Sequence, residues 1–195
     1  ELAGKSSQLA AEQQTNTNLQ STNTTLNAEL QAIKDTEITN GYSFTYRNRL
    51  NNWSVNIPVG TYYYYTIQTR AEDNTKYSKM VTDKYGDGVL KMITDEINKI
   101  VVANDYNKLD IINIVRIFTQ TLPRTNKDST APSDNYTRYP IETLLANGGD
   151  CEDNSILAAA ILTRLNCEVV FFVYDQYKHV ALGVYYPAFS GLGGW

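Results

Sequence analysis

The first 37 residues constrain the fold most, because they lack almost every residue that would interrupt a helix. This stretch has no proline and no aromatic residue, and it has no glycine after Gly4. A run without these residues can continue as one helix over many turns. We therefore expect residues 1–40 to form a long helix that ends at Asn40-Gly41, a pair typical of turns.

This predicted helix carries a weak heptad repeat, which is the pattern of a coiled coil. Asparagine at a core position of such a repeat can fix the register between helices. We expect a stalk that self-associates or holds the rest of the chain away from a surface. A solvated linker helix or a partly disordered stalk is the alternative, because polar residues fill much of the repeat. Counted from Leu2, one core position holds Leu2, Leu9, Asn16, Asn23 and Leu30, and the other holds Lys5, Glu12, Leu19, Leu26 and Ile33.

Residues 41–84 are rich in aromatic and β-branched side chains, and they predict a small β-rich segment. Strand-like runs extend from Tyr42 to Tyr46, from Trp53 to Ile57 and from Tyr62 to Thr69. We expect these runs to form an antiparallel layer that leads into the core. The four consecutive tyrosines in the third run are expected to pack against neighbours and not to bind a ligand.

Residues 85–195 show helical patterns followed by strand patterns. Apolar residues recur on one helix face over residues 87–103 and from Leu109 to Leu122. A further helix begins near Cys151, and two strand-like runs follow it, from Glu168 to Tyr174 and from His179 to Tyr186. Helices that are followed by adjacent strands place the chain in the α+β class.

The two cysteines are predicted to be separate thiols. Cys151 stands at the start of a predicted helix, and Cys167 follows its end. A helix of about 15 residues holds its ends roughly 22 Å apart, whereas the Cα atoms of a disulfide lie within about 7 Å. Cys167 enters an apolar strand and is expected to be a small buried hydrophobic residue.

Cys151 is the candidate nucleophile. Gly148 and Gly149 allow close approach of the backbone, and Asp150 is a good N-cap. Backbone N–H groups and the helix dipole at this position favour a thiolate and can stabilise an oxyanion on an attacked carbonyl. His179 is the only histidine of the chain, and it can return on an adjacent strand to act as the base. A capped structural helix with an inert cysteine is the alternative.

At these residues the chain resembles the transglutaminase-like superfamily, particularly its archaeal and bacterial cysteine peptidase domains. The resemblance covers roughly residues 85 to 186. It implies a transglutaminase-like, papain-like core in which Cys151 is the nucleophile and His179 is its base. The matching segments run from Tyr139 to Leu144, from Gly149 to Asp153 and from His179 to Val184, with the helix from Ile114 to Gln120 as weaker support.

The resemblance also indicates further residues around the nucleophile. It implies that Tyr139 lines the cleft, and Asp150 is a further candidate for the cleft or the oxyanion site. Gln120 is a candidate side-chain donor to the oxyanion, or else a polar residue at the edge of its helix.

The superfamily pattern includes a third residue, an Asp or Asn that orients the histidine. No Asp, Glu or Asn follows His179 in this sequence. We expect the core to be truncated at its C-terminus, with the third residue beyond Trp195, or else this copy is incomplete and inactive. Loss of the orienting residue can lower the rate by orders of magnitude.

Some bacterial members of the superfamily bind calcium through acidic residues near the nucleophile. Here the candidates are Glu142, Glu152 and Asp153, which lack the alternating spacing of a calcium-binding loop. We expect structural roles for them, no metal ion and no cofactor.

Two functions remain open. The first is a surface-displayed thiol enzyme that hydrolyses peptide or amide bonds of a protein or peptide substrate, or transfers the acyl group to an amine. The second is a catalytically incomplete domain that serves adhesion or surface assembly.

Composition excludes some partners and favours an extracellular location. A net charge of −4 without a basic patch argues against nucleic-acid binding. No apolar run is long enough to span a membrane, so we expect membrane attachment only through an anchor outside this sequence, for example before Glu1. Asn23, Asn52 and Asn135 begin possible N-glycosylation sequons, which fit an extracellular or cell-surface protein.

Overall fold

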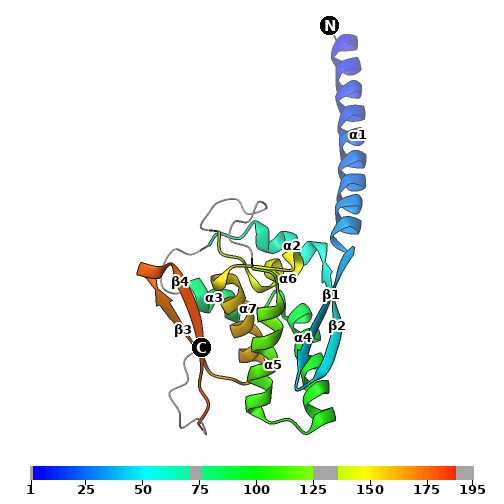
Figure 1. Cartoon of the computed structure of the whole chain (residues 1–195). Coiled ribbons are helices and arrows are strands. Elements are labelled where there is room, and N and C mark those ends of the chain that lie inside the picture. Colours follow the sequence, from blue (N-terminus) through cyan, green and yellow to red (C-terminus); the bar gives the residue numbers. More distant parts are fainter. Residues whose placement is uncertain (1, 71–75, 125–135, 188–195) are drawn as a thin grey trace.

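The computed structural model describes residues 2–70, 76–124 and 136–187. It begins with one long helix, α1 (Leu2–Lys34), which projects away from the rest of the molecule (Figure 1). The remaining helices and two small antiparallel sheets make an α+β fold, as the sequence predicts.

The N-terminal helix ends earlier than predicted. Asn40 and Gly41 do not break it, because both lie inside strand β1 (Glu37–Tyr46). The Asn40 amide donates hydrogen bonds to the carbonyl oxygens of Leu144 and Leu145 at 2.8 and 3.0 Å. These tertiary contacts outweigh the local preference of an Asn-Gly pair for a turn.

Strand β1 pairs with β2 (Arg49–Pro58) as an antiparallel hairpin. The turn residues Arg47 and Asn48 have positive φ values of 47° and 61°, which suits a two-residue hairpin turn. Side chains alternate between solvent and the main core along both strands. The inward-facing residues are Tyr42, Phe44, Tyr46, Trp53, Val55 and Ile57.

The prediction of a third strand, from Tyr62 to Thr69, is wrong. Helix α2 (Val59–Thr66) includes all four of its tyrosines. The buried Tyr65 hydroxyl accepts a hydrogen bond from the Gly86 backbone N–H at 2.7 Å, and the Tyr64 ring stacks on Tyr85. Tertiary packing therefore overrides the β propensity of a tyrosine run, while the tyrosines pack as expected.

The helices predicted from apolar periodicity are present. They are α4 (Asp87–Asn104) and α5 (Lys108–Thr121). Two short helices were not predicted from the sequence, namely α3 (Lys76–Thr82) and α6 (Pro140–Ala146).

Helix α7 (Cys151–Arg164) lies at the centre of the helices and is buried from Ile156 to Leu162. It contacts α3, α4, α5 and α6 and also the second hairpin, β3 (Val169–Tyr174) and β4 (His179–Val184). A short 3-10 helix, η1 (Asp175–Tyr177), connects these strands. The cysteines are both free, and Cys167 is buried, as predicted.

Candidate active site

The start of α7 is built by a capping box. The Asp150 carboxylate accepts hydrogen bonds from the backbone N–H groups of Glu152 and Asp153 at 2.8 and 3.0 Å. In return, the Asp153 carboxylate accepts one from the Asp150 N–H at 3.3 Å. Asp150 is therefore the N-cap, as predicted, and Cys151 is the first residue of the helix.

Residues 147–150, which connect α6 to Cys151 and are called the nucleophile loop after this candidate nucleophile, contain two glycines. These glycines allow the loop to pack against the end of α5. A Cβ atom on Gly148 would lie 2.6 Å from the Pro123 carbonyl oxygen, and one on Gly149 would lie 2.6 Å from the Asp153 Cβ. The Gly149 N–H donates to the same Pro123 oxygen at 3.2 Å. A larger residue at 148 would push the loop away from Pro123, and one at 149 would push it away from Asp153, so both glycines are needed for close approach.

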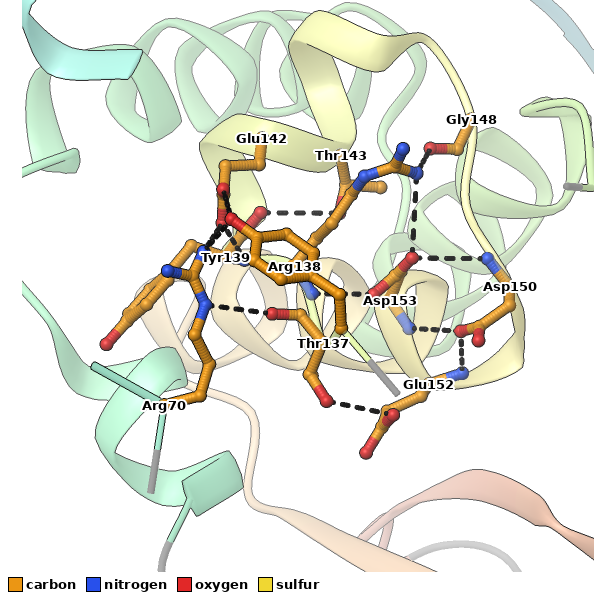
Figure 2. A network of polar contacts seen from close by, with 11 residues as sticks. Arg70, Thr137, Arg138, Tyr139, Glu142, Thr143, Gly148, Asp150, Glu152 and Asp153 are labelled. Atoms are coloured by element: carbon orange, nitrogen blue, oxygen red, sulfur yellow. Dashed lines mark hydrogen bonds and ion pairs between the residues drawn. The ribbon is translucent and has the colours of Figure 1, made fainter. Parts of the chain in front are cut away.

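A buried arginine binds this loop and the start of α7 (Figure 2). The Arg138 backbone N–H donates to Asp153 Oδ1 at 2.8 Å, and its guanidinium donates to the Gly148 carbonyl at 3.1 Å. The same guanidinium lies 3.7 Å from Asp153 Oδ2. Burial raises the pKa of Asp153 to about 7, against the opposing effect of the Arg138 hydrogen bond. Arg138 was not predicted from the sequence, because nothing in its local pattern marks it.

The other acidic residues near the nucleophile also have protein partners. Glu142 forms an ion pair with Arg70 and accepts a hydrogen bond from the Tyr139 N–H at 2.8 Å (Figure 2). Glu152 accepts a hydrogen bond from the Thr137 hydroxyl at 3.0 Å. No group of three or more His, Cys, Asp or Glu residues suited to a metal ion occurs in the described part of the chain.

A cavity of about 350 Å³ lies where α5, the start of α7 and β4 meet. Cys151, His179 and Gln120 all line it, although they come from three separate elements. The Ser155 hydroxyl, one turn after Cys151, donates to the Cys151 carbonyl at 2.7 Å and lies 3.4 Å from the Val180 carbonyl oxygen at the start of β4. The structure thus brings together three of the residues that the sequence singles out.

His179 is exposed at the beginning of β4, opposite Tyr174 in the hairpin. The two rings are stacked with their centroids 6.2 Å apart. Within the described residues, no hydrogen bond joins His179 to Cys151. The two residues therefore line one cavity but are not hydrogen-bonded to each other.

Tyr139 lies elsewhere. Its ring packs against Tyr65, with centroids 4.7 Å apart, and under the Arg70 guanidinium. Neither Tyr139 nor Asp150 is among the described residues that line the cavity. Tyr139 is the N-cap of α6, and burial raises the pKa of its hydroxyl.

Three further polar residues of the cavity were not singled out in the sequence. Arg116 precedes Gln120 by one turn of α5, and Asn154 follows Cys151 by one turn of α7. Arg124 forms an isolated β-bridge with Gly149. Helical spacing from Gln120 and Cys151 is the signal that could have identified the first two.

The predicted glycosylation sites differ in what the structure describes. Asn23 is exposed on α1, and Asn52 is exposed on β2. Asn135 lies outside the described residues.

Among the described residues there is no helix whose length and apolar character would let it cross a membrane. Comparisons with protein-family models, curated proteins and solved structures gave no match to this chain.

Proposed function

We propose that the protein is a transglutaminase-like thiol enzyme of the cell surface or extracellular space, which hydrolyses peptide or amide bonds. The observation that carries this proposal is the shared cavity of Cys151 and His179 at the N-terminus of α7. The backbone N–H groups at the capped helix start can stabilise negative charge that develops during acyl transfer. The superfamily resemblance assigns the same two residues to the same roles.

The proposed reaction uses a thioester intermediate. His179 accepts the thiol proton while the Cys151 sulfur forms a bond to the substrate carbonyl carbon. The C–N bond then breaks, and the leaving amine takes the proton from His179. Water attacks the thioester with His179 as base, which releases a carboxylic acid and restores the thiol. An amine in place of water would give transamidation.

The developing oxyanion has two candidate donors in the cavity. The Cys151 backbone N–H is at the first position of α7, where a helix has no internal acceptor for it. Gln120 of α5 lines the same cavity. Preorganised donors of this kind supply a large share of the stabilisation in acyl transfer.

The separation of His179 from Cys151 defines one requirement of the proposal. The imidazole must turn away from Tyr174 and towards the thiol when substrate binds. Catalytic hydrogen bonds are often long before substrate is present. His179 stands on an exposed hairpin end, so this rotation disturbs no buried packing.

Alkylation of Cys151 tests the proposal. Iodoacetamide at neutral pH should modify Cys151 faster than an ordinary thiol, and His179→Ala should remove the excess rate. Peptide mapping separates Cys151 from the buried Cys167. A slow reaction in the full chain that is unchanged by His179→Ala would contradict the enzyme.

A specific observation favours the assembly function as a second candidate. The large exposed apolar residues of α1 all occupy the two predicted core positions of the heptad repeat. Such residues bury one another when a second copy aligns in parallel. They are Leu9, Leu19, Leu26, Leu30 and Ile33.

The polar residues of α1 support the same parallel alignment. Asn16 and Asn23 would each face their own copy at a core position, as in register-fixing coiled coils. Glu29 and Lys34 occupy flanking positions that meet between parallel helices, so each pair of copies gains ion pairs of opposite charge. We propose that α1 self-associates in parallel, so that the folded domains of the copies lie together at its C-terminal end.

Sedimentation of the full chain tests this association. Replacing both Leu26 and Leu30 with Ser should shift the protein to the monomer at micromolar concentration. Ala28→Ser, on the opposite face of α1, is the matched control and should leave the association intact. Wild-type protein that sediments as a monomer at all concentrations would rule the stalk assembly out.

A further inference from the structure

The cavity beside Cys151 has a basic wall. Arg116 lies on α5, one turn before Gln120, and Arg124 lies just after the helix, bridged to Gly149. Both arginines line the cavity that contains the candidate nucleophile. The lining of this cavity therefore includes two arginines.

The positive charge of this wall contrasts with the net negative charge of the whole protein. The chain has 21 acidic and 17 basic residues, yet no Asp or Glu occurs among the described residues that line the cavity. The nearby acidic residues Glu142, Asp153 and Asp150 instead bind Arg70, Arg138 and the helix start, respectively (Figure 2). A cavity of one charge concentrates ligands of the opposite charge.

Arg124 is available to such a ligand. Its side chain is exposed and makes no hydrogen bond or ion pair within the part of the chain that the structure describes. An arginine of this kind can form a bidentate pair with a carboxylate.

A second polar group in the cavity also lacks a partner. The Asn154 side-chain oxygen is buried, with no hydrogen-bond donor near it among the described residues. An unsatisfied buried acceptor is costly, and a substrate N–H would satisfy it. The remaining walls include the apolar residues Ile112, Leu162 and Leu182, which can hold the hydrocarbon part of a ligand.

We infer that the acyl substrate carries a carboxylate close to the attacked carbonyl, and that Arg124 and Arg116 determine this preference. The inference rests on the proposed thiol chemistry at Cys151. The carboxylate belongs either to an acidic side chain or to the C-terminus of a peptide. Both sources offer the same group to the arginines.

Two alkylating agents of similar size test the inference directly. Iodoacetate carries a carboxylate and iodoacetamide does not, so the ratio of their rates at Cys151 measures the preference for an anion. Arg124→Gln and Arg116→Gln should each lower this ratio about three- to tenfold at low salt. Lysine at either position should keep most of it.

Arg49→Gln is the matched control, because Arg49 lies on the β1–β2 hairpin and contacts Asn104, away from the cavity. It removes the same charge from the protein and should not change the ratio. If Arg116→Gln does not fold, Arg124→Gln decides alone, since Arg124 is exposed.

The outcomes separate the two proposals. A fast, His179-dependent reaction with iodoacetamide, with a rate ratio that neither arginine variant changes, would overturn the carboxylate preference alone. A slow reaction that does not depend on His179 would overturn the thiol enzyme and this inference together.

Protection experiments identify the source of the carboxylate. N-acetylglutamate α-amide, which has only a side-chain carboxylate, and N-acetylalanine, which has only a terminal one, are each added before iodoacetamide. The compound that matches the substrate should slow the alkylation of wild-type Cys151 and should protect Arg124→Gln much less. Absence of protection by both would count against the inference.

Discussion

The two hairpins of the protein share antiparallel pairing but differ in their surroundings. In β1–β2, alternate side chains enter the main core, and Trp53 packs against Phe44 and Phe118 with ring centroids 4.9 and 5.0 Å away. In β3–β4, large side chains face solvent, and Phe172 and Tyr174 are 48% and 47% exposed. The two hairpins lie on opposite sides of the helices (Figure 1).

The buried hairpin supports the helices, whereas the exposed hairpin carries the candidate base. The β1–β2 hairpin fixes α5 and α6, whose ends hold the nucleophile loop. The β3–β4 hairpin carries His179 at an exposed end. Elements with few buried contacts open more easily than core elements, so His179 lies on the hairpin that should open more easily.

Substitutions of aromatic residues should give the largest difference in stability between the two hairpins. Trp53→Ala removes a side chain that is 7% exposed and should lower the free energy of unfolding by about 3–5 kcal/mol. Phe172→Ala in the other hairpin should cost less than about 1.5 kcal/mol, because much of the ring is already in water. Urea unfolding monitored by circular dichroism gives both values, and equal losses would contradict the contrast.

The buried carboxyl of Asp153 should make stability depend on pH. Its pKa is raised from 3.8 to about 7 in the folded protein, so folding favours the protonated form. The resulting stabilisation is complete below pH ~4 and is lost as pH rises through about 7, with a total of about 2–4 kcal/mol. Asp153→Asn should flatten this dependence.

Urea unfolding between pH 4.5 and 8 measures this effect of Asp153. Glu12→Gln, on the exposed helix α1, is the control for loss of one carboxylate. A wild-type stability that rises across this range in parallel with Asp153→Asn would show that Asp153 has no such role.

The smallest expected effect concerns the link between the second hairpin and the nucleophile helix. The Tyr77 ring stacks on Phe171 of β3 with centroids 4.9 Å apart, and its hydroxyl donates to Glu152. Tyr77→Phe should cost about 0.5–1.5 kcal/mol and speed amide exchange in β3–β4. Tyr177→Phe, at a side chain 78% exposed, should change neither quantity. Faster exchange in β1–β2 instead would contradict the link.

The sequence predicts those features that depend on local pattern. Apolar periodicity predicts α4 and α5, and the Asp150 cap with its two glycines predicts the start of α7. The sequence motif predicts that His179 acts with Cys151, and the structure places both residues at one cavity, although no hydrogen bond joins them among the described residues.

Features that depend on distant partners could not be predicted in this way. The tyrosine run of α2 has strand propensity, but its conformation depends on contacts with Gly86 and Tyr139. Arg138 acquires its role only when the nucleophile loop folds over it. Arg124 likewise has no sequence pattern, because a β-bridge to Gly149 places it at the cavity.

Acyl transfer to Cys151 tests the central claim most directly. The full chain is mixed with p-nitrophenyl acetate at neutral pH, quenched at intervals and examined by peptide mass spectrometry. We predict rapid acetylation of Cys151 followed by hydrolysis of the thioester, with both steps slowed at least a hundredfold in His179→Ala. Acetylation of Cys151 at the same rate in wild type and His179→Ala, or none at Cys151, would contradict the account.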